Sequence, residues 1–235
     1  EKLKSFFSLL GVIMGVMFLI IVVTVVEGLD RYVREDLTSQ IFGVNTVTLS
    51  RSPSVNINTT REQRRERNRR PRLRFEDADA VREQLELPAR VAVESQTGGS
   101  IVGDNGITAS GVSITGASPA IFEIRDHTIE FGRAFTTQEN AAGSAVLVIG
   151  SETADLVFEG QSAIGRNMRV RGFPYRVIGV LEERGSLFGQ SLDNMVIAPA
   201  RSPLRAITAP LGYVDDIIIQ AIDPDQLRDI QMEVE

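Results

Sequence analysis

Few side chains in this 235-residue sequence have the types and spacing that catalysis requires. His127 is the single histidine, and the sequence has no cysteine. A metal site or a nucleophile–base pair needs several such groups close together. His127 lies among polar residues, as expected of a surface residue or a satisfied polar residue. Asp215 and Asp216 interrupt an apolar run, so we expect both carboxylates to face solvent at the edge of a sheet. We therefore predict a non-enzymatic chain with no catalytic residue, no metal site and no cofactor of its own.

The segment from Gly160 to Asn167 has the glycine spacing of a phosphate-binding loop. In such a loop a lysine reaches the phosphates and a serine or threonine holds magnesium. Here Arg166 and Asn167 occupy those positions, and the only lysines are Lys2 and Lys4 near the N-terminus. We interpret the segment as a turn that leads into a strand. A Ser/His/Asp hydrolase remains an alternative by composition, although the sequence has no G-x-S-x-G motif.

Gly11 and Gly15 have the spacing of a helix-packing motif. Two glycines four residues apart lie on one face of a helix and let a second helix approach closely. Glycine is also common in membrane helices without any such role. We predict that Gly11 and Gly15 pack against partner helices.

Residues 51–74 form a strongly basic segment, with eight arginines between Arg61 and Arg74. Its prolines and asparagines predict a mobile loop. Such a loop is commonly a solvated linker, and the alternative is contact with anionic lipid headgroups or an acidic partner. Because no aromatic residue interrupts the arginines and the net charge is −6, nucleic acid is not an expected partner.

An uncharged run of 21 residues, from Phe6 to Val26, is long enough to cross a membrane. At 1.5 Å per residue it spans about 31 Å, close to the thickness of the hydrocarbon core. A cleaved signal peptide is the alternative, but signal peptides have apolar regions of about 7–15 residues and a small-residue cleavage site. No such site follows this run, so we predict a retained transmembrane helix.

The charges beside this run predict its orientation. Lys2 and Lys4 precede it, and the residues that follow it are mixed in sign. Positive flanking charges favour the cytoplasmic side. We therefore expect the inner (cytoplasmic) membrane, with the N-terminus in the cytoplasm and the main domain in the periplasm or outside the cell.

A charged segment directly after the run has helical periodicity. Four apolar residues recur every fourth position, at Leu29, Val33, Leu37 and Ile41. This spacing predicts one apolar stripe on a helix that continues past the membrane as a stalk and ends at Gly43. Such a stalk would couple movement of the domain to movement of the span.

The remaining sequence predicts an α+β domain. We expect helices at 75–87, 118–123 and 151–158, the last with Ser151 as its N-cap, and a final helix that begins at Asp223-Pro224. Strand patterns occupy 44–50, 145–149, 168–171, 173–181, 195–198 and 213–221, with an extended segment at 130–135. We expect strand 173–181 to turn on Gly172 as a hairpin with the strand before it. Between 90 and 116 we expect short β runs broken by glycine.

Several phrases, in their order and spacing, resemble the permease subunits of MacB-like ABC transporters. This group also includes lipoprotein-release and FtsX-like permeases. The resemblance extends from about residue 4 to residue 223. It rests on segments 4–16, 27–30, 111–122, 130–136, 145–151, 156–166 and 173–181.

The resemblance implies a two-lobed periplasmic domain, in which a β-rich lobe is inserted into an αβ lobe. We accordingly expect the transmembrane helix and stalk in residues 1–43, the αβ lobe in 44–96 and 190–235, and the inserted lobe in 97–189. Members of the family continue into three further transmembrane helices, so this chain resembles a fragment. The arginine-rich stretch is a departure from the family pattern.

The resemblance also implies a function and partners. ATP would be hydrolysed by a separate or fused ABC ATPase, while the periplasmic domain relays the conformational change for export or efflux. The implied partners are that ATPase, a second permease in a homodimer or heterodimer, a periplasmic adaptor and membrane lipid. The alternative is a single-pass membrane-anchored adaptor that couples to no ATPase. A peptide, a lipoprotein, a lipid and a drug all remain open as cargo.

Overall fold

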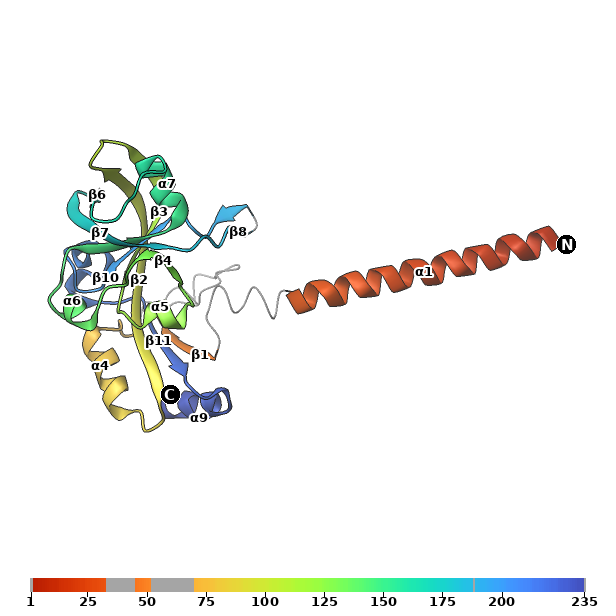
Figure 1. Cartoon of the computed structure of the whole chain (residues 1–235). Coiled ribbons are helices and arrows are strands. Elements are labelled where there is room, and N and C mark those ends of the chain that lie inside the picture. Colours follow the sequence, from red (N-terminus) through yellow and green to blue (C-terminus); the bar gives the residue numbers. More distant parts are fainter. Residues whose placement is uncertain (1, 33–44, 52–69, 188, 235) are drawn as a thin grey trace. The chain divides into compact units, whose positions relative to one another are not determined.

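The computed structural model describes residues 2–32, 45–51, 70–187 and 189–234 (Figure 1). These residues fall into two units, Glu1–Val44 and Asn45–Glu235, which are described separately. The predicted stalk positions Val33, Leu37 and Ile41, the predicted helix end at Gly43, and most of the basic loop lie outside the described residues.

The first unit contains the single helix α1, Lys2–Tyr32. Its most apolar stretch, Leu10–Glu27, has a mean hydropathy of 2.7 and could cross a membrane. Every residue of that stretch is exposed, so its apolar side chains project from all sides of the helix. A helix that is apolar on all sides is stable when lipid surrounds it. The predicted apolar helix is confirmed, and its backbone continues past Val26 to Tyr32.

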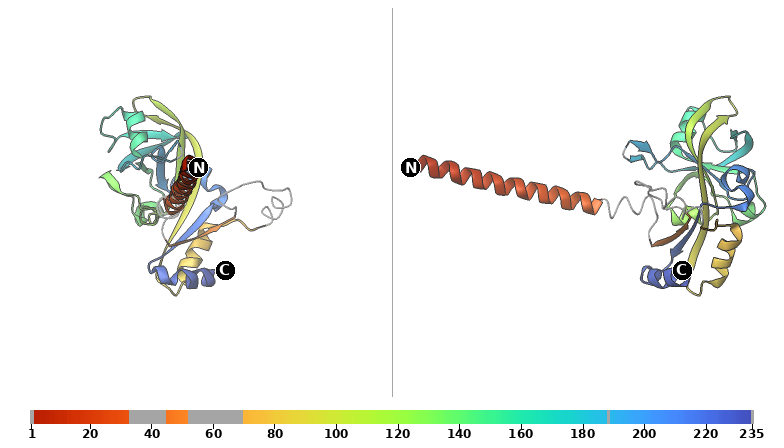
Figure 2. Two further views of the ribbon diagram at one scale, coloured as in Figure 1. Left: turned by 90° about the vertical axis from the view of Figure 1, so that its right-hand side faces the viewer. Right: turned by 180° about the vertical axis from the view of Figure 1, so that it is seen from behind.

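The second unit is built on a nine-stranded sheet with the order β1-β11-β2-β3-β10-β5-β7-β4, in which β6 pairs with β2 and β7 (Figures 1 and 2). Two pairs, β3 with β10 and β5 with β7, are parallel, and the other pairs are antiparallel. The strands are β1 (Thr46–Ser50), β2 (Ala89–Gly103), β3 (Thr108–Ala117), β4 (Ile129–Gly132), β5 (Val146–Ile149), β6 (Asn167–Val170), β7 (Phe173–Leu181), β10 (Met195–Pro199) and β11 (Asp216–Ala221).

Short helices and one separate hairpin complete this unit. The hairpin pairs β8 (Ser186–Leu187) with β9 (Gln190–Ser191). The helices are α4 (Phe75–Gln84), α5 (Ile121–Ile124), α6 (Thr137–Ala141), α7 (Ser151–Phe158), α8 (Arg205–Thr208) and α9 (Leu227–Val234), with 3-10 turns η2 (Pro210–Gly212) and η3 (Pro224–Gln226).

Strand β2 corrects the prediction of short β runs. It continues for 15 residues, through Gly98 and Gly99, and pairs with β11, β3 and β6 along its length. A side chain at Gly99 would come within 2.7 Å of Ile114 and 2.8 Å of Arg171, so glycine makes room there for neighbouring side chains. Pairing with β3, in which Gly98 lies opposite Ser113 and Gly99 opposite Val112, compensates for the weak strand propensity of glycine.

The apolar core divides into clusters along β2. Near one end of the strand, Val91 and Val93 pack with Phe75, Ile217 and Ile230. Near the other end, Ile101 belongs to a cluster that contains the buried aromatic residues Phe158 and Tyr175. In Figure 1 this division corresponds to α4, β11 and α9 at one end of the sheet and α7, β6 and β7 at the other. One strand therefore runs through both predicted lobes, and the residue boundaries of the lobes stay a prediction.

Local patterns predicted several elements correctly. The turn between β6 and β7 has positive φ at Arg171 (52°) and Gly172 (91°), as a two-residue hairpin turn of type I′ requires. Asp223 accepts a hydrogen bond from the backbone N–H of Asp225 at 3.1 Å, which confirms it as an N-cap. The first turn after it is the 3-10 turn η3.

Two other helix boundaries differ from prediction. Helix α4 ends at Gln84, three residues before the predicted Leu87. Ser151 is the first residue of α7, and Gly150 occupies the N-cap position. A side chain at residue 150 would overlap the carbonyl group of Asp193, so only glycine fits this position.

We predict that Gly132→Ala destabilises the second unit by about 2–4 kcal/mol. Gly132 has φ of +80°, and a Cβ atom there would overlap the carbonyl oxygen of Ile178. Urea denaturation of the chain in lipid nanodiscs, followed by circular dichroism, measures the change. The matched control is Gly98→Ala, where the added methyl meets nothing within 4 Å. Equal destabilisation by the two substitutions would contradict this account.

Candidate functional site

The predicted packing residues of α1 lie on an open face. Gly11 and Gly15 are one helical turn apart, and a Cβ atom at either would meet nothing within 4 Å. This geometry leaves room for a second helix backbone, and packing against one stays a prediction. Of the four predicted stalk residues, only Leu29 falls within α1.

A groove of about 470 Å³ in the second unit is lined by both apolar and charged side chains. Strand β2 contributes Val91 and Val93, and α4 contributes Phe75 and Ala78. The opposite wall consists of residues 118–120 and residues of α6. The groove is thus formed by segments that are far apart in the sequence, and no sequence motif predicted it.

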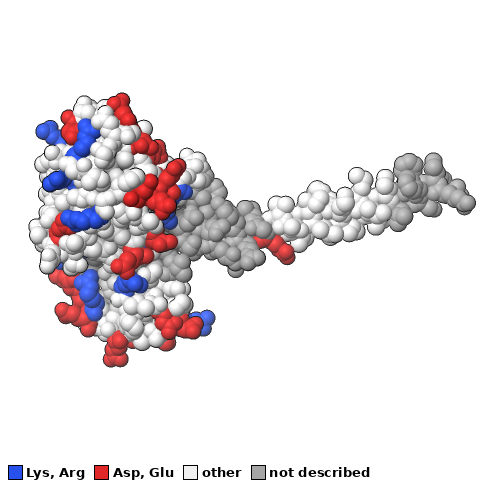
Figure 3. Space-filling view, viewed as in Figure 1, with Lys and Arg blue, Asp and Glu red and all other residues white. Residues whose placement is uncertain are grey.

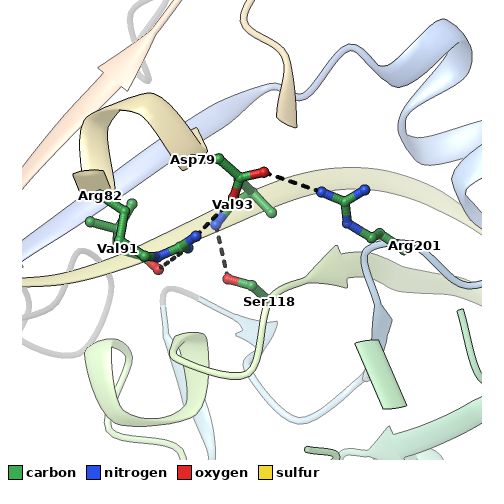
Figure 4. A network of polar contacts seen from close by, with 6 residues as sticks. All are labelled: Asp79, Arg82, Val91, Val93, Ser118 and Arg201. Atoms are coloured by element: carbon green, nitrogen blue, oxygen red, sulfur yellow. Dashed lines mark hydrogen bonds and ion pairs between the residues drawn. The ribbon is translucent and has the colours of Figure 1, made fainter. Parts of the chain in front are cut away.

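A network of polar contacts crosses this groove (Figure 4). On α4, the Asp79 carboxylate accepts a hydrogen bond from Arg82 Nη1 at 2.8 Å, three residues further along the helix. Its second oxygen lies 3.5 Å from Arg201 Nη2. Arg82 also donates to the carbonyl oxygen of Val91 at 3.3 Å. Asp79 is 52% exposed, so these ion pairs contribute at most about 1 kcal/mol each to stability.

The side chains of this network are held in position by neighbouring elements. The guanidinium group of Arg201 lies 4.7 Å from the centre of the Phe75 ring, and this cation–π contact helps to hold it in place. The hydroxyl of Ser118 accepts a hydrogen bond from the backbone N–H of Val93 at 3.0 Å. Helix α4 itself begins where Asp77 accepts a hydrogen bond from the backbone N–H of Arg74 at 2.7 Å.

His127 is a satisfied polar residue, as the sequence predicted. It is half-buried, its Nδ1 lies 3.3 Å from Arg184 Nη1, and its ring meets Phe122 edge-on. Burial, followed by repulsion from the guanidinium groups of Arg184 and Arg125, lowers the pKa of His127 to about 4. The imidazole is therefore neutral at physiological pH.

Ion pairs join other segments of the domain. Arg125 and Glu94 pair at 2.7 Å and are only 16% and 17% exposed. Arg133 donates two hydrogen bonds to the Glu139 carboxylate, and these bonds lower the pKa of Glu139 to about 2. Arg133 lies in the extended segment 130–135 and holds α6 through Glu139. The sequence alone did not predict this contact.

The position of Asp215 and Asp216 corrects one prediction. Strand β11, which begins at Asp216, lies between β1 and β2 and is not an edge strand. The Asp215 side chain is exposed, and its carboxylate accepts a hydrogen bond from the backbone N–H of Gln96 at 3.1 Å. Partial burial of the carboxyl group raises the pKa of Asp215. This carboxylate therefore joins the start of β11 to β2.

The segment from Gly160 to Asn167 is a turn that leads into β6, as predicted. Arg166 pairs with Asp104 and lies 4.6 Å from the centre of the Phe158 ring, so its contacts are structural. Among the described residues, no group of three or more histidine, aspartate or glutamate side chains could hold a metal ion.

The described residues thus combine an apolar helix that could span a membrane with a separately folded α+β domain. This combination defines a class of membrane-anchored proteins with a domain outside the lipid. Within that class, the sequence matches the MacB-like periplasmic core domain over residues 5–235, and the chain belongs to this family. The family and the apolar helix together indicate a membrane-anchored chain with a periplasmic domain.

Several relatives are ATP-binding/permease proteins. The chain is 27% identical over 231 residues to the macrolide export protein MacB of Bdellovibrio bacteriovorus, covering 98% of this chain and 34% of that protein. It is 25% identical over 228 residues to MacB of Neisseria gonorrhoeae, covering 97% and 33%. The pyoverdine export protein PvdT of Pseudomonas aeruginosa is 28% identical over 201 residues, covering 85% and 28%. The chain therefore spans about a third of the length of these relatives.

Solved structures have the same fold. The periplasmic region of MacB from Actinobacillus actinomycetemcomitans aligns with a TM-score of 0.62 and 19% identity, covering 85% of this chain and 87% of that one. The extracellular domain of the ABC-type transporter YknZ from Gram-positive bacteria aligns with a TM-score of 0.58 and 18% identity, covering 69% and 80%. These similarities confirm the predicted α+β fold class.

We predict that His127 makes the domain less stable as the pH falls from about 6.5 to about 4. The folded state keeps the imidazole neutral down to a pKa of about 4, whereas the unfolded state binds a proton near 6.5. The stabilisation is thus present above pH 6.5 and is lost as the pH decreases. Urea midpoints at pH 7.5, 5.5 and 4.5 measure it. His127→Gln should flatten this part of the profile, and parallel profiles for the two proteins would refute the assignment.

Proposed function

We propose that this chain is the first transmembrane helix and periplasmic domain of a MacB-like ABC transporter permease. On this proposal the domain relays an ATP-driven conformational change across the membrane for export or efflux. The family match over residues 5–235 carries the proposal. The relatives named above are ATP-binding/permease proteins, so each combines ATP binding and permease activity in one polypeptide.

The connection of the strands supports a relay. Strands β1 and β11 are antiparallel neighbours, so Asn45, at the start of the domain, lies beside Ala221, near its end. The backbone N–H of Ala221 donates to the carbonyl oxygen of Asn45 at 3.0 Å. A displacement transmitted through the chain from α1 would therefore reach the paired strands β1 and β11, and β2 continues from β11 into the rest of the sheet.

The proposed orientation places the N-terminus in the cytoplasm and the second unit in the periplasm. The proposed partners are an ABC ATPase, separate or fused, a second permease in a homodimer or heterodimer, a periplasmic adaptor and membrane lipid. ATP would bind to the ATPase and not to this chain. Nucleic acid is not a proposed partner, because basic and acidic side chains alternate over the face shown in Figure 3.

A membrane-anchored adaptor that couples to no ATPase is the second candidate. The apolar helix α1 alone would suit it equally well, since one span is sufficient for an anchor. The two candidates differ in what accompanies the chain. Three further spans and an adjoining ATP-binding cassette, found by sequencing the complete gene and its neighbours, would support the permease, and their absence would support the adaptor.

We predict that Leu29→Asp and Val33→Asp in the complete transporter reduce transport at least tenfold and leave ATP binding by the ATPase intact. A charge on the apolar stripe would disrupt packing of the stalk, through which the relay would act. Transport into vesicles and nucleotide binding are measured on the same preparations. Ser39→Asp, on the opposite face of the predicted helix, is the matched control. Normal transport by both stripe variants would reject the coupling role.

We also predict that Gly11→Leu or Gly15→Leu lowers the yield of assembled transporter at least fivefold. A leucine side chain would keep a partner helix from approaching the backbone of α1. Size-exclusion chromatography of the complete complex in nanodiscs measures assembly. Ile13→Phe adds three carbon atoms on the opposite face of the helix and should have little effect. If it reduced assembly as much as the glycine variants, the motif would have no specific role.

A further inference from the structure

Two cations and one anion face each other in the groove between α4 and α6. Its lining contains the guanidinium groups of Arg82 and Arg201, and the carboxylate of Asp79. The remaining lining residues are uncharged. The groove therefore carries an excess positive charge of about one unit beside a partly apolar wall.

The two arginines differ in how fully their donors are used. Arg82 is held by Asp79 at 2.8 Å and by the carbonyl oxygen of Val91 at 3.3 Å. Arg201 has five N–H donors in its guanidinium group, and its only described hydrogen bond from them is 3.5 Å long. This length is at the limit of a hydrogen bond. Arg201 therefore keeps the capacity to bind a carboxylate through two donors.

The guanidinium group of Arg201 is already held beside an aromatic ring. It lies against the Phe75 ring at 4.7 Å from the ring centre, and Phe75 itself is 6% exposed. A stacked guanidinium loses less freedom when it binds a carboxylate in a two-pronged arrangement. Figure 4 shows Arg201 reaching toward Asp79 across the strand that carries Val91 and Val93.

The walls of the groove would receive an apolar group beside that carboxylate. Ala78, Val91 and Val93 are buried and contribute to the lining, and Pro119 and Ala120 face them. The volume of about 470 Å³ lies within the range of about 300–1,000 Å³ that is typical of small-molecule sites.

We propose that this groove is a binding site for a small molecule in which a carboxylate is joined to a compact apolar group. The carboxylate pairs with Arg201 and is attracted by Arg82, while the apolar group packs on the buried wall. Asp79 competes with the ligand for both arginines. The relay function does not require this site, so the two proposals can fail independently.

The test uses the whole chain in phosphatidylcholine nanodiscs and a fluorinated probe, 4-(trifluoromethyl)phenylacetate, observed by ¹⁹F NMR. The matched neutral probe is the corresponding amide, and empty nanodiscs correct for partition into lipid. We expect the carboxylate to bind at least tenfold more tightly than the amide. Arg201→Gln should weaken carboxylate binding at least tenfold, and Arg228→Gln on α9 is the control without effect.

Asp79→Asn distinguishes a ligand site from a structural ion pair. If Asp79 competes with the ligand, its neutralisation should tighten carboxylate binding about threefold or more, opposite in sign to Arg201→Gln. If the pair only maintains the fold, both substitutions weaken binding. Equal binding of acid and amide to the unsubstituted chain, or weakening by Asp79→Asn, would overturn the proposal even if Arg201→Gln did not fold.

Discussion

The pairing of β2 on both sides is the constraint on which the second unit depends. At about 3.3 Å per residue its 15 residues extend about 50 Å. The strand therefore contributes residues to both apolar clusters, one near each of its ends. It hydrogen-bonds to β11 over its first half and to β3 and β6 farther along. Because one continuous strand belongs to both ends, the two clusters cannot separate without breaking its ladder.

This continuity suits the domain to the proposed mechanical role. A β-ladder transmits displacement through short hydrogen bonds between rigid strands, whereas an isolated loop would absorb it. The domain receives the chain at β1, which pairs with β11, and β11 pairs in turn with β2. The ion pair between Arg125 and Glu94 adds a contact from β2 to the turn after α5.

The parts that the sequence predicted are those determined by neighbouring residues. The turn at Arg171-Gly172, the cap at Asp223 and the apolar strand β5 each depend on a few consecutive side chains. The length of β2 was missed because glycine weakens a strand locally, whereas in the fold the pairing of Gly98 with Ser113 and of Gly99 with Val112 on β3 supports both glycines. The N-cap at Gly150 was missed because the backbone that leaves no room for a side chain there belongs to Asp193, which is distant in the sequence.

The groove between α4 and α6 could not be predicted from neighbouring residues in the sequence. Asp79 and Arg201 are 122 positions apart, and each alone is an ordinary surface residue. They meet because α4 packs beside β2 and because residue 201 follows β10, which pairs with β3 next to β2. The proposed relay depends on backbone pairing, and the proposed ligand site depends on side chains that this pairing brings together. Replacing Arg201 therefore removes a charge from the groove and leaves the ladder intact. Ligand binding would affect the relay only if the groove bound the ligand with different affinities in the two conformations of the domain.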